Sequence, residues 1–244
     1  MQEAAMRTRA PKTVQDQRLI EGVASSLPIF WGLTPNQVAG IGRSCWTLQV
    51  RRGELIVQRD GPMPGVFALG YGSVKLSLCG LDGEERVMRL VAPGQTFGEA
   101  TALLGKPSRY EARALADCKL VVIPAAAILS LIERDPRFAR RMVLTLAERA
   151  LEMLAELESA TLRRGAQRLA SYLVSLAEPA GQNGAPNGSC TVRLPATKTV
   201  IASRLNMEKA TLSRLLRSLS EQGLIGVAQR DITILDRERL LGLI

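Results

Sequence analysis

The sequence predicts an α+β protein with an N-terminal antiparallel β-roll, one long helix, and a C-terminal domain of helices followed by a β-hairpin. Short β-rich runs separated by glycines occupy residues 45–124, which is typical of an antiparallel roll or barrel. An apolar repeat of helical period follows over 136–159. Two helical segments and two short β-rich runs lie near the end of the chain. The expected domains are a flexible arm over 1–18, the β-roll over 19–134, the long helix with a hinge over 135–160, and the C-terminal domain over 161–244.

Two short helices and six strands are expected in the N-terminal half. Thr34 can cap a helix that has Pro35 at its first position. The sequence Leu81-Asp82-Gly83-Glu84 predicts the tip of a hairpin, because Asp-Gly supports positive φ in a tight turn. The expected helices span Leu19–Ser25 and Pro35–Ile41, and the expected strands span Leu55–Gln58, Val66–Leu69, Ser73–Leu78, Arg86–Leu90, Glu111–Ala114 and Lys119–Ile123.

The long helix carries an apolar seam with spacings of three and four residues. A seam of this kind is found in helices that pair with a second helix, and also in helices packed on their own domain. A second apolar stripe allows this helix to make both contacts, so we expect a homodimer in which one face packs on the roll and another on the partner. The seam is formed by Val143, Leu146, Ala150, Met153 and Leu157, and the second stripe by Ala147, Leu151 and Leu154.

The last third of the chain has the element order of a winged helix-turn-helix. Thr197 can cap a first helix, Asn206-Met207 forms the turn, and a second helix ends at Gly223, where a left-handed C-cap is favoured. The expected helices span Leu162–Ala177, Lys198–Leu205 and Glu208–Gln222, with a loop over Pro179–Ser189 and strands over Val192–Leu194, Leu224–Ala228 and Ile232–Leu235.

The second helix of this motif has an apolar and a polar face. Leu212, Leu215, Leu216 and Leu219 form the inward stripe, which an ordinary amphipathic surface helix would also have. Residues 161–244, however, hold 12 basic and 6 acidic residues in a chain of net charge +9, which favours a polyanionic partner. Arginine can donate two hydrogen bonds to guanine, and Ser or Thr can bond a base edge or a phosphate. The candidate contacts to double-stranded DNA are Lys198, Thr199, Lys209, Ala210, Thr211, Ser213, Arg214 and Arg217.

Composition excludes several classes of chemistry. The chain has no histidine, which removes Ser-His and Cys-His catalysis, imidazole metal sites and histidine-ligated haem, so we expect no enzyme and no metal site. Its four cysteines show no Cys-x-x-Cys spacing, and the N-terminal arm has none, so an iron-sulfur cluster there is not expected. No secretory signal or membrane-length apolar run is present, and we expect a cytoplasmic protein without membrane contact.

The sequence resembles the Crp/Fnr superfamily of transcription regulators. The resemblance rests on Thr199–Leu205, Ala210–Leu216 and Gly223-Leu224-Ile225, which look like that family's DNA-binding module. It rests also on Arg52-Gly53-Glu54 with Gly61, and on Phe97-Gly98-Glu99 with Ala102-Leu103-Leu104, which resemble its cyclic-nucleotide-binding-like β-roll, and it covers about residues 27–240.

The resemblance implies a homodimer held by helix 136–159, with a hinge near Ser159–Leu162 that links a sensor to the DNA-binding domain. A signal in the β-roll would be relayed through the long helix to two half-sites of a near-palindrome, with RNA polymerase as a further partner. Lys209, Ala210, Ser213 and Arg214 fall where the family reads bases, and Thr211 at a phosphate contact. Many members have Glu where this chain has Ala210, so the usual half-site is not assumed.

The effector remains open. Gly98 and Glu99 match family residues that approach the phosphate and hold the ribose of a cyclic nucleotide, but Ser108 stands where the phosphate-binding arginine is expected, with Arg109 next to it. Cys79 and Cys118 are alternative candidates for a redox or sulfur-sensing thiol, although lone cysteines are usually small buried hydrophobes. The competing function is a cyclic-nucleotide-binding regulatory module with no DNA role, which would leave the basic winged helix unexplained.

Overall fold

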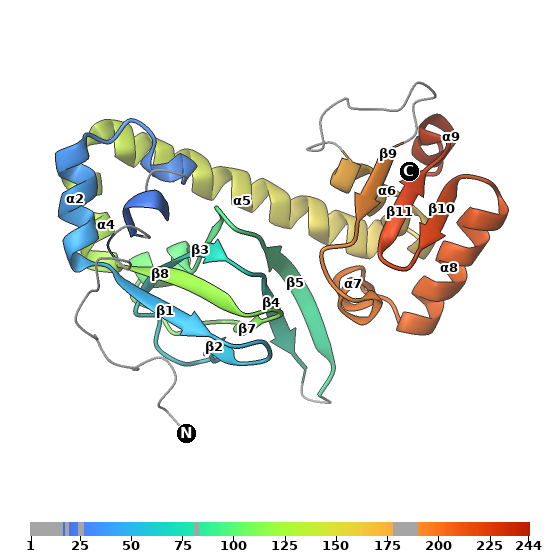
Figure 1. The fold of residues 1–244 in the computed structure, drawn as a ribbon, viewed down its shortest axis with the longest axis horizontal. Helices are drawn as coiled ribbons and strands as arrows, with labels where there is room; N and C mark the ends of the chain where they lie inside the picture. The colour runs from blue at the N-terminus through green and yellow to red at the C-terminus, as the bar shows by residue number, and fades with distance from the viewer. Residues whose placement is uncertain (1–16, 18–19, 24–26, 81–82, 178–189) are drawn as a thin grey trace. The chain divides into compact units, whose positions relative to one another are not determined.

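The computed structural model describes residues 17, 20–23, 27–80, 83–177 and 190–244, and the chain forms two compact units (Figure 1). The first unit spans Met1–Ala150 and the second Leu151–Ile244. The boundary falls within one continuous helix, α5 (Pro136–Leu162). The predicted arm over 1–18 and the predicted loop Pro179–Ser189 lie almost entirely outside the described residues.

The first unit is built on two four-stranded antiparallel sheets, as the glycine-punctuated runs predict. All six predicted strands are present with bounds within two residues of those expected. Two further strands, β1 and β6, were not predicted. One sheet has the order β1 (Trp46–Val50), β8 (Cys118–Pro124), β3 (Gly65–Tyr71), β6 (Thr96–Phe97), and the other β2 (Leu55–Val57), β7 (Glu111–Ala114), β4 (Val74–Cys79), β5 (Glu85–Val91).

The apolar faces of these strands meet in one core. Phe67 of β3 and Phe97 of β6 stack with ring centroids 4.9 Å apart, and both are buried. Glycine is required at two close approaches: a Cβ at Gly65 would lie 2.2 Å from the Ile123 carbonyl oxygen, and one at Gly72 (φ +98) 2.4 Å from that of Asp117. A hairpin joins β4 to β5 as predicted, with Cys79 opposite Glu85 and Gly83 at φ +82, although Leu81 and Asp82 lie outside the described residues.

Helices cover a second cluster of buried residues in this unit. Thr34 and Gln37 form the capping box that begins α2, which confirms the predicted start, and Phe30 stacks on Phe138 of α5 at 5.8 Å. At Pro124 the chain passes from β8 into a helix that was not predicted, α4. The helices here are η1 (Pro28–Phe30), α2 (Pro35–Ser44), α3 (Glu99–Leu103), α4 (Ala125–Arg134) and the first part of α5; residues 20–23 of the predicted helix Leu19–Ser25 are also helical.

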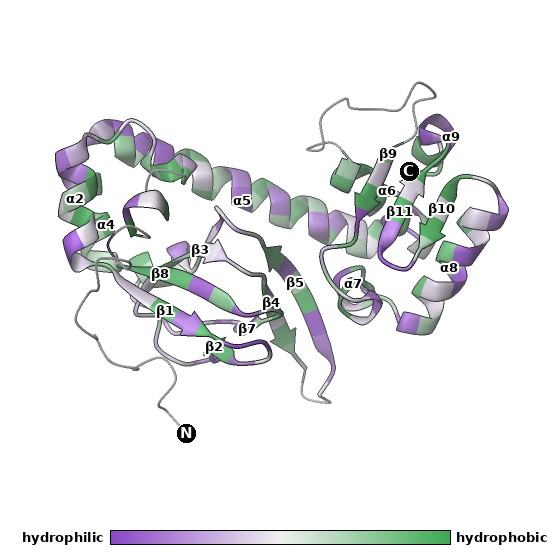
Figure 2. Cartoon of the chain, in the orientation of Figure 1, coloured by the Kyte–Doolittle hydropathy of each residue, from purple (hydrophilic) through white to green (hydrophobic). Residues whose placement is uncertain are grey.

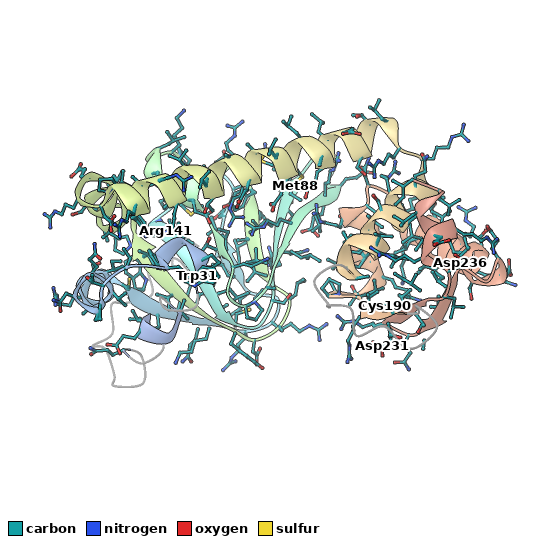
Figure 3. The ribbon with its side chains drawn as sticks, turned by 90° about the horizontal axis from the view of Figure 1, so that it is seen from above. Trp31, Met88, Arg141, Cys190, Asp231 and Asp236 are labelled. Carbon is teal, nitrogen blue, oxygen red and sulfur yellow. The ribbon has the colours of Figure 1, made fainter. Side chains whose placement is uncertain are left out.

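Helix α5 begins at a side-chain cap and divides its residues between two environments. The Asp135 carboxylate accepts hydrogen bonds from the backbone N–H groups of Arg137 (2.9 Å) and Phe138 (3.1 Å). Phe138 and Met142 are buried, and Arg141 donates its Nε to the Ile29 carbonyl oxygen at 3.3 Å (Figure 3). Bands of hydrophobic and hydrophilic residues therefore alternate along the helix (Figure 2).

Two predictions about α5 are corrected. Leu146, expected in the dimer seam, is half-buried and packs against the core of the first unit, because it continues the face formed by Phe138 and Met142. The hinge residues Ser159–Leu162 are helical, with the Thr161 hydroxyl bonded to the Leu157 carbonyl oxygen (2.8 Å), so α5 ends later than expected. The apolar side chains that stay exposed on α5 are Val143, Leu144, Leu151, Met153, Leu154, Leu157 and Leu162.

The second unit continues from α5 with a helix, a strand, the helix-turn-helix and a hairpin. Its three strands form a sheet of order β10, β11, β9, and its helices surround buried Leu169, Leu173, Ile201 and Leu212. The Asp236 side chain caps the last helix by accepting the Arg239 N–H at 2.9 Å (Figure 3). The elements are α6 (Gly165–Ala177), β9 (Cys190–Arg193), α7 (Lys198–Arg204), α8 (Lys209–Glu221), β10 (Ile225–Ala228), β11 (Asp231–Ile234) and α9 (Arg237–Leu241).

The lengths and hydropathy of the helices bear on membrane contact. Within the described parts of the chain, no helix combines the length and the apolar character needed to cross a bilayer.

The cap of α5 predicts a pH-dependent contribution to stability. The backbone N–H of Phe138, with the Gln37 side chain, holds the pKa of Asp135 below its ordinary value. A lowered folded-state pKa contributes stability above the unfolded-state value, which is lost as the pH falls through the folded-state value. We expect Asp135→Asn to lower the melting temperature at pH 7 and the difference from wild type to shrink as the pH falls below about 4.

The measurement is a series of thermal melts followed by circular dichroism between neutral and acid pH. Glu133→Gln, an exposed carboxylate on the neighbouring helix, is the matched control and should leave the melting temperature unchanged. A difference between Asp135→Asn and wild type that stays constant with pH would contradict the assignment of this charge to the cap.

Candidate nucleic-acid interface

The helix-turn-helix is formed by α7, a short turn and α8. The Thr197 hydroxyl accepts the Val200 N–H at 3.5 Å and caps α7, as predicted. Asn206 adopts a left-handed conformation (φ +51), and the Met207 N–H bonds back to the Ala202 carbonyl oxygen at 3.0 Å. Asparagine tolerates this conformation better than most residues, so the chain reverses within the predicted turn.

Helix α8 has the two faces that its sequence predicts. Leu212, Leu216 and Leu219 are buried, Leu215 is half-buried, and Gly223 follows with φ +70. The candidate contacts on α8 recur at steps of three and four residues and so share the opposite face. Of these, Lys209, Ala210, Ser213, Arg214 and Arg217 are exposed and Thr211 is half-buried; on α7, Thr199 is exposed and Lys198 half-buried.

The exposed face of α8 is basic near its N-terminal end. Arg217 is paired with Glu221 at 2.8 Å, which offsets its charge, whereas the Arg214 guanidinium makes a long contact of 3.4 Å with the Thr211 hydroxyl. Lys209 and Arg214 therefore present most of the uncompensated charge of this face. Long cationic and small hydroxyl side chains at the start of a helix can enter a major groove and bond base edges or phosphates.

The hairpin after α8 forms the wing. Its turn contains Gln229 in a left-handed conformation (φ +55). The Arg230 guanidinium folds back and donates from Nε and Nη2 to the Leu194 carbonyl oxygen at 3.2 and 2.8 Å. Through Nε and Nη2, Arg230 thus links the wing to the residue that follows β9.

Two arginines that sequence reasoning missed hold the helix-turn-helix in place. Arg168 of α6 donates to three backbone carbonyl oxygens, at Leu205 (2.8 Å), Asn206 (3.2 Å) and Arg163 (2.6 Å). Arg204, the last residue of α7, pairs with Glu156 of α5 at 2.5 Å. The contacts of Arg168 with Leu205 and Asn206, and that of Arg204 with Glu156, leave no local sequence pattern, because these partners are distant in the chain. Together they tie the turn of the motif to α6 and to the end of α5.

The comparisons with known proteins agree with this geometry. Residues 47–135 match the family model of the cyclic nucleotide-binding domain, and residues 167–243 match that of the Crp-like helix-turn-helix domain. The Global nitrogen regulator of Synechococcus elongatus is 30% identical over 188 residues, which cover 76% of this chain and 84% of that protein. The CRP-like cAMP-activated global transcriptional regulator of Mycobacterium tuberculosis is 24% identical over 87% of this chain and 94% of its own.

The solved structure of FixK2 from Bradyrhizobium japonicum has the same fold, with a TM-score of 0.72 over 82% of this chain and 96% of its own at 22% identity. A cyclic-nucleotide-binding-like β-roll followed by a helix-turn-helix defines a transcription regulator with a DNA-binding domain. The chain belongs to the Crp/Fnr superfamily.

The effector candidates of the β-roll differ in burial and in their contacts. Gly98 has φ +91 and precedes α3, where a Cβ would lie 3.0 Å from the Met63 sulfur, and Glu99 is buried. Ser108 is also buried, but its hydroxyl donates to the Tyr110 carbonyl oxygen at 2.8 Å. Arg109 is exposed. The phosphate-binding position therefore holds an uncharged, already bonded side chain.

The residues around Glu99 do not fit a cyclic nucleotide. Its carboxylate pairs with the Arg149 guanidinium of α5 at 3.0 Å and accepts a hydrogen bond from the Thr96 hydroxyl. A ribose hydroxyl would have to compete with this ion pair for the same oxygen. With Ser108 in place of a cation, the position lacks the phosphate-binding group that the family's resemblance implies, and its carboxylate is already paired.

The two cysteines differ in their surroundings. Cys118 is buried, its thiol donates to the carbonyl oxygens of Ser73 (3.3 Å) and Ala116 (3.2 Å), and burial raises its pKa. These are the properties of an unreactive thiol. Cys79 is half-buried at the end of β4, where its carbonyl oxygen accepts from Arg59 at 2.7 Å.

The contacts of Arg168 predict a loss of stability in the second unit. Arg168→Met keeps the length and helix propensity but leaves three carbonyl oxygens without their donor. We expect a loss of about 1–3 kcal/mol in the free energy of unfolding, measured by urea titration. Arg164→Met, an exposed arginine nearby, is the matched control, and equal effects of the two substitutions would show that the contacts of Arg168 contribute nothing.

Proposed function

We propose that the protein is a sequence-specific DNA-binding transcription regulator that acts as a homodimer on a near-palindromic site. The observation that carries this proposal is that α8 has one buried apolar face and one exposed polar face. The buried residues are Leu212, Leu216 and Leu219, and the exposed ones include Lys209, Ser213 and Arg214. A nucleotide-binding module without a DNA role would give no reason for this basic, exposed face.

Each α8 would enter a major groove with its first turns. Arg214 is long enough to donate two hydrogen bonds to a guanine, Ser213 and Lys209 contact neighbouring base edges, and Thr211 contacts a phosphate. Lys198, Thr199 and Arg217 would add backbone contacts. Ala210 offers no acceptor to a cytosine amino group, so the half-site differs from that of family members with Glu at this position.

Dimerisation would use the exposed apolar residues of α5. Val143, Ala150 and Leu157 recur every seven residues, and Ala147 and Leu154 repeat between them, which is the a/d pattern of a coiled coil. Leu154 and Leu157 are each 60% exposed, and a row of large exposed apolar side chains on a soluble chain marks an association surface. Leu146 and Met153 of the predicted seam lie outside this pattern.

A dimer of this kind would place its two α8 helices about 34 Å apart, one turn of DNA. A signal received in the β-roll would reach them through α5, and RNA polymerase would be the partner at a promoter. The mycobacterial relative is named as cAMP-activated, but the surroundings of Glu99 and Ser108 described above argue against transferring that effector to this chain.

The proposed role of Arg214 predicts a specific loss of DNA affinity. We expect Arg214→Ala to weaken binding to the selected palindrome by about 1–3 kcal/mol and to relax the preference at one base pair of each half-site. Fluorescence anisotropy on duplexes selected from a degenerate pool measures both effects. Arg237→Ala, which removes an exposed arginine of α9, is the control for charge alone. Equal losses for the two variants would mean that Arg214 does not read a base.

The proposed dimer predicts that a charge on the α5 stripe separates the subunits. Leu154→Glu would place a carboxylate in the apolar seam, and we expect a monomer by light scattering at concentrations where the wild type is a dimer. Leu104→Glu is the control, because Leu104 is similarly exposed (66%) but lies outside α5. A dimer that survives Leu154→Glu and Leu157→Glu would place the interface elsewhere.

A further inference from the structure

The last part of α5 belongs to the second unit but contributes no buried side chain to it. The structure describes α5 from end to end, and the buried residues of this helix are Phe138 and Met142, both in the first unit. From Leu151 onwards its side chains are exposed or half-buried. The burial of an apolar face, which holds most helices on their domain, therefore does not orient this segment.

An ion pair joins this segment to the helix-turn-helix. The Arg204 guanidinium, at the end of α7, donates to the Glu156 carboxylate at 2.5 Å, and the two side chains are 21% and 32% exposed. Arg204 also lies near Tyr172 of α6, since burial raises the pKa of Tyr172 to about 12 and the charge of Arg204 acts against this rise. The pair is therefore largely withdrawn from water, where screening is weak.

The residues that follow Arg204 are held from α6. The carbonyl oxygens of Leu205 and Asn206 accept hydrogen bonds from Arg168 at 2.8 and 3.2 Å. Arg168 also donates to the Arg163 carbonyl oxygen, between α5 and α6, at 2.6 Å. Residues 204–206 are thus bonded both to the end of α5 and to α6, and α8 begins three residues later.

The ion pair and the proposed dimer seam lie on opposite sides of α5. Glu156 is eighteen residues beyond Phe138, which is five turns of an α-helix, so the two share a face. Leu154, two residues before Glu156, is turned by about 200° from it and is exposed. One side of α5 thus meets the helix-turn-helix of its own subunit, and the other carries the apolar residues proposed to meet the partner helix.

We propose that Glu156 and Arg204 are positioning residues that determine which half-site spacing the dimer accepts. The path from the dimer seam to the exposed face of α8 runs through α5, this ion pair and the turn of the motif. A fixed pair gives the two α8 helices one separation, so both subunits bind at once only where the half-sites have that separation. The inference rests on the proposed function, because it requires a homodimer on a two-fold site.

The affinity of a dimer for a full site depends on this geometry. Once one α8 is in its groove, the second has a high effective concentration only at a half-site that it can reach. One base pair of spacing moves a half-site by about 3.4 Å along the duplex and about 35° around it. A rigid connection therefore discriminates between adjacent spacings, whereas a connection that has lost the ion pair tolerates several of them at lower affinity.

Fluorescence anisotropy on duplexes that differ only in spacing tests this role. Two copies of the selected half-site are placed with their centres about 8 to 13 base pairs apart, and a duplex with one half-site measures binding without the second contact. We expect the wild type to prefer one spacing by about tenfold over its neighbours. Glu156→Gln and Arg204→Met should each lower the affinity at that spacing by about fivefold and remove most of the preference, with single-half-site affinity unchanged within about twofold.

Two further variants separate the position of the charges from their presence. The double variant Glu156→Arg/Arg204→Glu should regain part of the spacing preference, because it restores an opposite-charge contact between the same positions. Glu152→Gln, which removes an exposed carboxylate one turn earlier on α5, should behave as wild type. Thermal melts and light scattering establish that each variant is folded and dimeric, and Glu156→Gln, the mildest change, decides the test if the double variant does not fold.

The outcomes distinguish this inference from the proposed function. A folded, dimeric Glu156→Gln with the spacing preference of the wild type, or a wild type that binds all spacings equally, would overturn the role of the pair and leave DNA binding intact. A single-half-site affinity that falls as much as the full-site affinity would contradict the inference too, because the pair would then support the reading surface itself. A wild type that binds no duplex, with or without added cyclic AMP, would overturn the proposed function.

Discussion

The packing of Phe138 and Met142 into the core of the first unit is the contact on which the arrangement of α5 depends. Both side chains are buried, and Phe138 also stacks on Phe30, so the start of the helix is fixed by apolar contacts and by its cap at Asp135. Because a helix repeats every 3.6 residues, fixing this face also fixes which residues point away from it. The exposure of Val143, Leu154 and Leu157 is a direct consequence.

The second unit is held together by a different kind of contact. Its helices share a core of leucine and isoleucine that includes Leu205, and the backbone of the turn between α7 and α8 is bonded by Arg168, while Arg204 pairs with Glu156. Arginine suits this position because its planar guanidinium can serve several carbonyl oxygens at once. The exposed face of α8 makes only contacts within its own helix, such as the Arg217–Glu221 pair, and Lys209, Ser213 and Arg214 on it are exposed.

The elements were predictable where the determining interactions are local. The leucines of α8 repeat with helical period and Gly223 marks the end of the helix, so its bounds were predicted within one residue. Strands between glycines were predicted almost as closely. Strand β1 was missed although its sequence alternates: Trp46, Leu48 and Val50 pack on the core, with polar residues between them, and the strand pairs with β8. Strand β6, at the other edge of the same sheet, is only two residues long, which is too short to show an alternating sequence pattern.

The residues of the candidate sites were likewise predictable only where a local sequence pattern determines their position. The exposed residues of α8 follow from periodicity, whereas the pairing of Glu99 with Arg149 joins residues 50 positions apart and leaves no local trace. Leu146 was placed in the dimer seam because a sequence repeat does not distinguish a helix face that meets its own domain from one that meets a partner. Long-range polar contacts and the choice between two apolar faces are tertiary properties.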